Sequence, residues 1–139
     1  MAYWLAKTEP DEFSYDDLER KGREPWNGVR NPTALKHMRA MKPGDLVMIY
    51  HTGDVRAIVG VGRVSSEPYP DPGAEDPKFV AVDVQPAYRF DRPVTLAEVK
   101  ADADFAAWEL VRQSRLSVMP VSEGHWAKLH VMAGAAARG

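Results

Sequence analysis

The sequence predicts an α+β protein, in which a small mixed β-sheet closes into a barrel and short α-helices lie around it. Apolar, strand-like segments stand near both ends of the chain, short segments that begin at helix-capping residues separate them, and no segment repeats. The 139 residues are 45% hydrophobic and 27% charged, which is typical of one globular domain. We therefore expect a single domain over residues 1–133 and a frayed tail over residues 134–139.

The first strand and the first helix are predicted by short local signals. Residues 3–6, Tyr-Trp-Leu-Ala, are apolar and aromatic and precede a Glu-Pro pair, which is typical of an opening strand. Ser14 is a good helix cap, and Asp17 stands at the third helical position after it. Gly22 then ends the pattern, so we expect a short helix near residues 15–21.

A second helix and a hairpin follow. Asn31 is a capping residue with proline directly after it, which indicates a helix that ends before the Lys-Pro-Gly-Asp turn. Residues 46–50 and 57–64 are apolar runs on either side of a tight polar segment and predict a β-hairpin. Gly60 and Gly62 lie two positions apart in this hairpin, where small residues allow another group to approach closely.

The second half of the chain carries the same kinds of signal. We expect a strand over residues 79–90, a helix capped by Thr95, a further helix that begins at Asp104, an edge strand over residues 116–121, which contain a proline, and a last helix capped by Ser122. Pairing the first strand with the late one would close the barrel.

Several kinds of chemistry find no support in the sequence. The chain has no cysteine, which excludes disulfides, thiolate metal sites and a cysteine nucleophile. His125 and His130 are five positions apart on one predicted helix, and that is not metal-ligand spacing. We expect no metal and no cofactor. No signal peptide and no run of 18 apolar residues is apparent, so we expect a cytoplasmic protein of the bacterial type that does not bind membranes.

The charge is unevenly distributed. The formal net charge is −2, which by itself argues against a nucleic-acid-binding protein. Residues 20–63, however, hold nine Lys and Arg against three Asp and Glu, and residues 110–139 hold four against one. A basic face on an acidic molecule is therefore possible, although such blocks are also common on solvated surfaces.

Trp26 stands in a polar stretch, residues 24–31, which we expect to be a loop. An aromatic ring in a polar loop is a candidate platform for base stacking. Asn27 and Asn31 can supply the paired donors and acceptors that a base edge demands. The alternative is that Gly28 merely makes a turn and Asn31 merely caps the helix.

A second polar cluster precedes the late strand. Arg112 and Arg115 flank Gln113 and Ser114, and this composition would suit contacts to phosphate groups beside a pocket. Arginine and serine are equally ordinary on a solvated loop.

Five motifs in register, running from residue 3 almost to the end of the chain, resemble the EVE domain. They are Tyr3–Pro10 (YWLAKTEP), Trp26–Asn31 (WNGVRN), Met41–Asp45 (MKPGD), Tyr50–Gly53 (YHTG) and Arg112–Val121 (RQSRLSVMPV). The resemblance implies a PUA-like fold, a small pseudobarrel with peripheral helices that is related to the PUA, ASCH and YTH domains.

The resemblance also implies a function, the non-catalytic recognition of a flipped, modified base in DNA or RNA. Modified cytosines, 5-methylcytosine or 5-hydroxymethylcytosine, are the leading candidates. The base pocket that it implies consists of Trp4, Lys7, Trp26, Asn31, Tyr50, His51, Ser114, Ser117 and Met119, with Arg30, Arg112 and Arg115 on the phosphates. Asn27 and Thr52 stand where the family often has Asp and Ser, and both keep hydrogen-bonding capacity.

The alternative function is enzymatic. His51, with Asp54 or Lys7, would serve as acid and base on a nucleotide or nucleic acid. No metal cluster and no activated nucleophile in the sequence supports this alternative. A reader of this size without an effector domain is expected to act as a monomer, either by occlusion or with a partner that the sequence does not identify.

Overall fold

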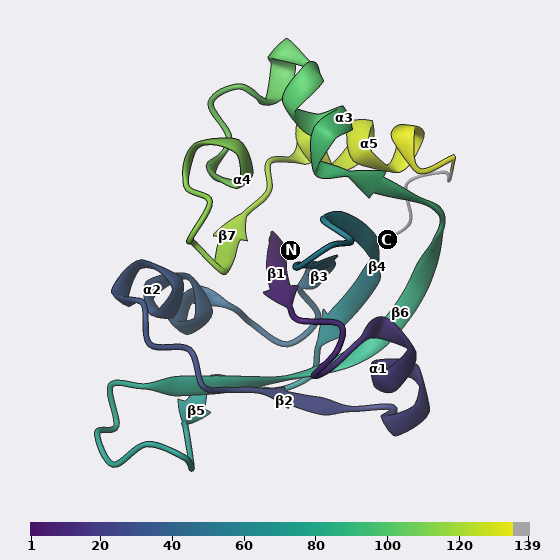
Figure 1. The fold of residues 1–139 in the computed structure, drawn as a ribbon. Coiled ribbons are helices and arrows are strands. Elements are labelled where there is room, and N and C mark those ends of the chain that lie inside the picture. The colour runs from purple at the N-terminus through teal and green to yellow at the C-terminus, as the bar shows by residue number, and fades with distance from the viewer. Residues whose placement is uncertain (135–139) are drawn as a thin grey trace.

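The structure, a computed structural model, describes residues 1–134 and shows a curled mixed sheet with short helices around it (Figure 1). The strands follow the order β2-β6-β4-β3-β1-β7, and β5 pairs with β6 beside this path. β1 is parallel to β3, and the other strand pairs of the described residues are antiparallel. The strands are β1 (Tyr3–Thr8), β2 (Glu24–Trp26), β3 (Leu46–His51), β4 (Ala57–Val64), β5 (Tyr69–Pro70), β6 (Val80–Thr95) and β7 (Val118–Pro120).

The predicted mixed sheet is confirmed, and so is the pairing of the first strand late in the chain. β1 pairs with β7, which lies at one end of the sheet, as expected for a strand that contains proline. The 16-residue strand β6 curves round the molecule and pairs with β2, β4 and β5 (Figure 1). Within residues 1–134 no ladder joins β2 to β7, so the sheet forms a half-barrel rather than a closed one.

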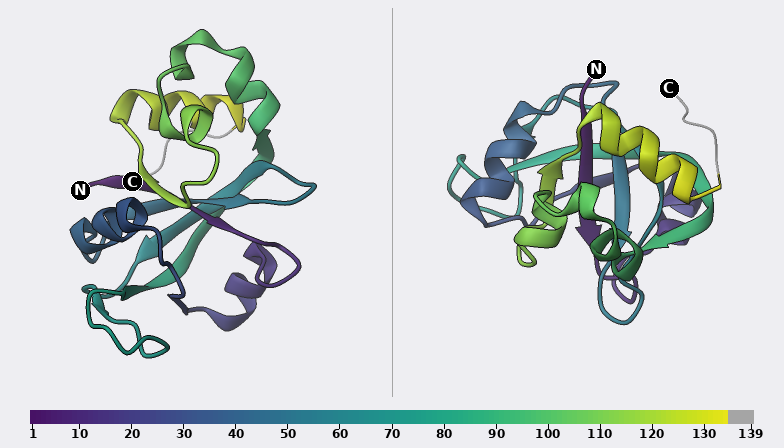
Figure 2. Two further views of the ribbon diagram at one scale, coloured as in Figure 1. Left: turned by 60° about the vertical axis from the view of Figure 1, so that its left-hand side comes forward. Right: turned by 90° about the horizontal axis from the view of Figure 1, so that it is seen from above.

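Short helices surround this sheet, and their predicted caps are confirmed. Ser14 and Thr95 each form a capping box, and the side chains of Asn31 and Ser122 accept backbone N–H groups. α3 and α5 lie together at one end of the molecule, away from α1, and α4 lies between that end and α2 (Figures 1 and 2). The helices are α1 (Tyr15–Lys21), α2 (Pro32–Ala40), α3 (Leu96–Ala101), α4 (Glu109–Arg112) and α5 (Glu123–Met132), with a 3-10 turn, η1 (Ala103–Phe105).

Two local predictions are wrong. The stretch over residues 24–31 is not wholly a loop, because Trp26 lies in β2 and pairs with Val82 of β6. That strand forms through a distant partner, which no local pattern reveals. Asp104 does not begin a helix: Asp102 caps η1 instead. Of the predicted tail, only Gly134 lies within the described residues.

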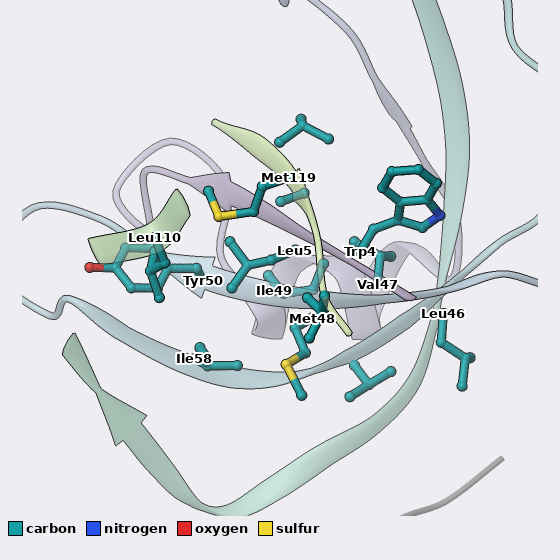
Figure 3. Packing of buried hydrophobic residues seen from close by; sticks show 14 of the residues in the cluster. Trp4, Leu5, Leu46, Val47, Met48, Ile49, Tyr50, Ile58, Leu110 and Met119 are labelled. Carbon is teal, nitrogen blue, oxygen red and sulfur yellow. The ribbon is translucent and has the colours of Figure 1, made fainter. Parts of the chain in front are cut away.

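The core includes three residues that the resemblance had placed in the pocket, namely Trp4, Tyr50 and Met119. Trp4 and Met119 are buried among the side chains of β1, β3 and β7 (Figure 3). The indole Nε1 of Trp4 donates to Oδ2 of the buried Asp45 at 3.0 Å. Asp45 also accepts the backbone N–H of Ala2 at 3.1 Å, so Trp4 fixes the start of β1 beside the turn that precedes β3.

The expected close approach at the two glycines of β4 is confirmed. A Cβ atom at Gly60 would lie 2.8 Å from the ring of Tyr15, and one at Gly62 would lie 2.7 Å from Cγ1 of Val84. The Tyr15 hydroxyl donates to the carbonyl of Val61 at 2.8 Å, and burial raises the pKa of this hydroxyl to about 12. This hydrogen bond ties the start of α1 to β4.

Candidate functional site

A cavity of about 410 Å³ opens between the end of β1, the segment that leads to α1, and β2 with the loop after it. Three of the predicted base-pocket residues, Lys7, Trp26 and Ser117, line it together with Arg30. We call it the main cavity. Its lining is Lys7, Thr8, Glu9, Glu12, Phe13, Glu24, Pro25, Trp26, Asn27, Gly28, Val29, Arg30 and Ser117.

Trp26 forms a fixed aromatic wall of the main cavity. Its ring is half-buried and meets the ring of Phe13 edge to face, with centroids 6.1 Å apart and an interplanar angle of 86°. Its backbone is held in β2 by the pairing with β6. A ring that is held on one side and accessible from a cavity on the other can stack on a planar ligand without first being ordered.

Asp71 holds the loop that follows Trp26. The buried carboxylate accepts the backbone N–H groups of Gly28 and Gly73, each at 2.8 Å, and a bond from Nη1 of Arg30 at 3.2 Å. The Gly28 N–H is the main reason that the pKa of Asp71 lies below its usual value. Gly28 has a φ of 74°, the left-handed conformation that glycine adopts readily.

Three carboxylates line the main cavity, and none of them is among the site residues predicted from the sequence. Glu9 accepts the Thr52 hydroxyl at 2.8 Å, and Glu24 pairs with Lys21 at 2.6 Å. Glu12 is exposed, and its carboxylate has no hydrogen bond or ion pair with any other described residue, although its backbone N–H donates to the Glu9 carbonyl at 3.0 Å. Glu9 stands inside the first family motif, which was the only sequence signal that pointed to this wall.

Lys7 separates the main cavity from a second one of about 290 Å³. Its Nζ donates to the backbone carbonyl of Ser114 at 2.9 Å and lies 5.6 Å from the centre of the Tyr50 ring. Burial lowers the pKa of Lys7. Tyr50 and Ser114, both predicted pocket residues, line the second cavity and not the main one.

A third hollow, of about 320 Å³, collects the second polar cluster. Arg112, Arg115 and Ser114 line it, as does Asn31. The Asn31 side chain accepts hydrogen bonds from the backbone N–H groups of Thr33 and Ala34. The alternative in which Asn31 caps the helix is therefore confirmed. Ser114 belongs to both this hollow and the second cavity, which are therefore neighbours.

The other three predicted pocket residues line none of these hollows. Trp4 and Met119 are in the core, as described above. His51 is buried, and its Nε2 accepts the backbone N–H of Tyr15 at 3.1 Å. Burial and the nearby Arg89 lower the pKa of His51. The ring therefore serves as a neutral acceptor that holds the start of α1.

The described residues give no sign of a metal site or a membrane span. Nowhere in residues 1–134 do three or more His, Asp or Glu side chains come together in a way that could hold a metal ion. None of the helices in the same part of the chain has the length and apolar character needed to cross a bilayer.

Comparison with known proteins places this arrangement in a family. The EVE domain matches residues 2–132. The chain spans about two thirds of the length of curated relatives that it matches. One of them, thymocyte nuclear protein 1 of Mus musculus, is 31% identical over 155 residues, which cover 87% of this chain and 69% of that protein.

Solved structures of other proteins have the same fold. Protein Atu2648 from Agrobacterium tumefaciens is 38% identical with a TM-score of 0.96, over 99% of this chain and 97% of that one. The human THYN1 protein in complex with 5-methylcytosine containing DNA is 27% identical with a TM-score of 0.88, over 96% of this chain and 98% of that one. ASCH from Zymomonas mobilis, 14% identical with a TM-score of 0.60 over 94% and 95% of the two chains, shares the fold alone. The half-barrel is PUA-like, and the chain belongs to the EVE domain family.

Proposed function

We propose that this chain, with residues 1–133 as one domain, binds nucleic acid and holds one modified cytosine in the main cavity without transforming it. The observation that carries the proposal is the fixed ring of Trp26 in the wall of a cavity of about 410 Å³ that polar and charged groups also line. The human THYN1 structure, which contains 5-methylcytosine DNA, supports this ligand class for the family.

A base must leave its stack before it can enter such a cavity. Extrusion from a duplex costs a few kcal/mol, and one stacking contact with an aromatic ring returns about 1–3 kcal/mol. Stacking on Trp26 therefore roughly offsets the extrusion and leaves little net affinity. Hydrogen bonds in the cavity and contacts to phosphate must supply the rest.

The carboxylate wall favours cytosine over thymine and uracil. The exocyclic amino group of cytosine donates hydrogen bonds, and a carboxylate accepts them, whereas thymine and uracil present a carbonyl oxygen at that position. Glu12 is the free acceptor among the three carboxylates, because Glu9 and Glu24 are engaged elsewhere. We assign the reading of the cytosine amine to Glu12.

Discrimination between methylated and unmodified cytosine is expected to be modest. Burying one methyl group is worth about 0.8 kcal/mol, which corresponds to a factor of about four in affinity. Lys7 and Ser117 line the same cavity as Trp26, while Trp4 and Met119 support β1 and β7 from the core.

Phosphate groups of the bound strand are assigned to the basic side of the site. The three glutamates would repel a phosphate that passed over their wall. Arg30 lines the main cavity, and Arg112 and Arg115 line the third hollow, so the backbone is expected to run over these arginines.

A polarisation titration with labelled oligonucleotides tests the proposal. One central position carries cytosine, 5-methylcytosine, 5-hydroxymethylcytosine or thymine, in single- and double-stranded DNA and in RNA. We expect the tightest binding for a modified cytosine and the weakest for thymine. Equal affinity for all four bases, or conversion of any oligonucleotide by the protein, would overturn the proposal, and the second result would favour an enzyme.

A further inference from the structure

The second cavity has cations and hydroxyl groups around an apolar floor. Its charged lining residues are Lys7, Arg56 and Lys100, from β1, the β3–β4 turn and α3. Among the residues that the structure describes, no Asp or Glu lines it. Leu96, Leu110, Val111 and the ring of Tyr50 supply the apolar surface, and Thr52 and Ser114 supply hydroxyl groups. Figure 3 shows Tyr50 and Leu110 side by side.

Two of these cations are not neutralised. Neither Arg56 nor Lys100 forms an ion pair with another residue of the described range, and both are exposed. Asp54 lines an adjoining hollow with them but lies beyond ion-pair distance. Lys7 donates only to a carbonyl. Glu9 accepts the hydroxyl of Thr52, which is one of the lining residues, but three cations line the cavity, so a net positive charge remains that attracts an anion.

Arg56 is also held in an unusual backbone conformation. Its φ of 46° makes it the one non-glycine residue with positive φ in residues 1–134. The conformation is fixed on both sides, because the Arg56 carbonyl accepts the Leu96 N–H at 2.8 Å and its Nε donates to the Gly53 carbonyl at 3.2 Å. Such a backbone conformation persists where the surrounding structure holds it. Arg56 is thereby kept among the residues that line the cavity.

We propose that the second cavity is an anion-binding subsite that takes one phosphate group of the nucleic-acid strand whose base occupies the main cavity. This rests on the proposed function. Lys7 lines both cavities, so a base in one and a phosphate in the other are separated by a single side chain. The third hollow adjoins the second cavity at Ser114, and in this proposal its Arg112 and Arg115 contact the phosphate on the other side of the flipped nucleotide.

The test measures whether one cationic side chain of the second cavity interacts with one phosphate group of the strand. Oligonucleotides with one 5-methylcytosine carry one neutral methylphosphonate linkage, placed in turn at each linkage near the modified base. With the wild-type protein, we expect one linkage on each side to weaken binding about tenfold when it is neutralised. In the Lys100→Gln variant, neutralising the linkage that occupies the second cavity costs little more, because its partner is already gone.

Two further variants provide a second test and a control. Arg56→Gln is expected to remove the sensitivity to the same linkage. Lys36→Gln changes an equally exposed helix lysine that lines neither cavity, and the full penalty is expected to remain. If every linkage keeps its full penalty in both Lys100→Gln and Arg56→Gln, the subsite is overturned while the base reader stands.

A wild-type protein that binds none of the oligonucleotides overturns the proposed function and with it the strand phosphate. A titration with inorganic phosphate, followed through the Nε–H signal of Arg56 by NMR, then examines the pocket alone. A saturable shift that Lys100→Gln abolishes would show an anion pocket with another ligand, such as a free nucleotide. The absence of a shift would also contradict anion binding in the second cavity.

Discussion

The ammonium group of Lys7 donates to the backbone carbonyl of Ser114 at 2.9 Å, across 107 positions of the sequence. This contact joins the end of β1 to the loop before β7 and forms the partition between the two cavities. A cation in that position touches both the base and the backbone of a bound nucleotide in our account, so the two halves of the proposed site meet at Lys7.

Replacing Lys7 by methionine removes the charge and keeps an apolar stem of similar length. We expect weaker binding and a log–log salt slope that is smaller by about 0.7–0.9, the value for one phosphate contact. Because burial lowers the pKa of Lys7, affinity for an anion is expected to fall with rising pH earlier than for an ordinary lysine. Lys36→Met is the matched control, and an unchanged salt slope in Lys7→Met would contradict the assignment.

Asp71→Ala is expected to loosen the loop after Trp26. It removes the carboxylate that accepts the backbone N–H groups of Gly28 and Gly73, and we expect the free energy of unfolding to fall by about 1–3 kcal/mol because hydrogen bonds to a charged group are lost. The lowered pKa of Asp71 means that this stability is present above the ordinary aspartate value of 3.8 and is lost as pH falls through the folded-state pKa. Urea titrations of both proteins between pH 7 and strongly acidic pH measure the difference, and a pH-independent difference would contradict the prediction.

Glu12→Gln is expected to reduce the preference for cytosine over thymine. A glutamine side chain both donates and accepts, so it pairs with the carbonyl of thymine as well as with the amine of cytosine. We expect the ratio of the two affinities to fall about threefold to tenfold in the polarisation titration. Asp11→Asn changes an exposed neighbour that does not line the cavity, and the ratio should stay the same. A ratio unchanged in Glu12→Gln would assign cytosine recognition to other groups.

Gly62→Ala tests the packing behind the site. The added methyl group would lie 2.7 Å from Cγ1 of Val84 and 3.0 Å from the carbonyl of Gln85, so β4 and β6 must shift. We expect a loss of about 1–3 kcal/mol in the free energy of unfolding. Gly124→Ala in α5 has open space around the new atom and is expected to be neutral or slightly stabilising. Equal stability of the two variants would show that the sheet yields more easily than its geometry indicates.

The helices were predicted well because their signals are local. Ser14, Asn31 and Thr95 act within three residues along the chain, and the structure shows each of them as a cap. β2 was missed because it exists through its pairing with β6, nearly 60 positions away along the chain.

The same difference between local signals and distant contacts applies to the residues of the candidate site. Of the residues that the family motifs indicate, Lys7, Trp26 and Ser117 line one cavity. They also named Trp4 and Met119, whose side chains the fold buries, because a motif records which residues matter and not which way they point. The cationic lining of the second cavity could not be predicted from the sequence, because Arg56 and Lys100 come together only in the folded chain.

The most direct test of the account is the quenching of intrinsic tryptophan fluorescence by an oligonucleotide with one 5-methylcytosine. Trp4, Trp108 and Trp126 are buried in the core, whereas Trp26 lines the main cavity, so stacking should quench Trp26. We predict saturable quenching in the wild-type protein, and its loss in Trp26→Ala together with the preference for the modified base. Quenching and preference that survive unchanged in Trp26→Ala would contradict the central claim.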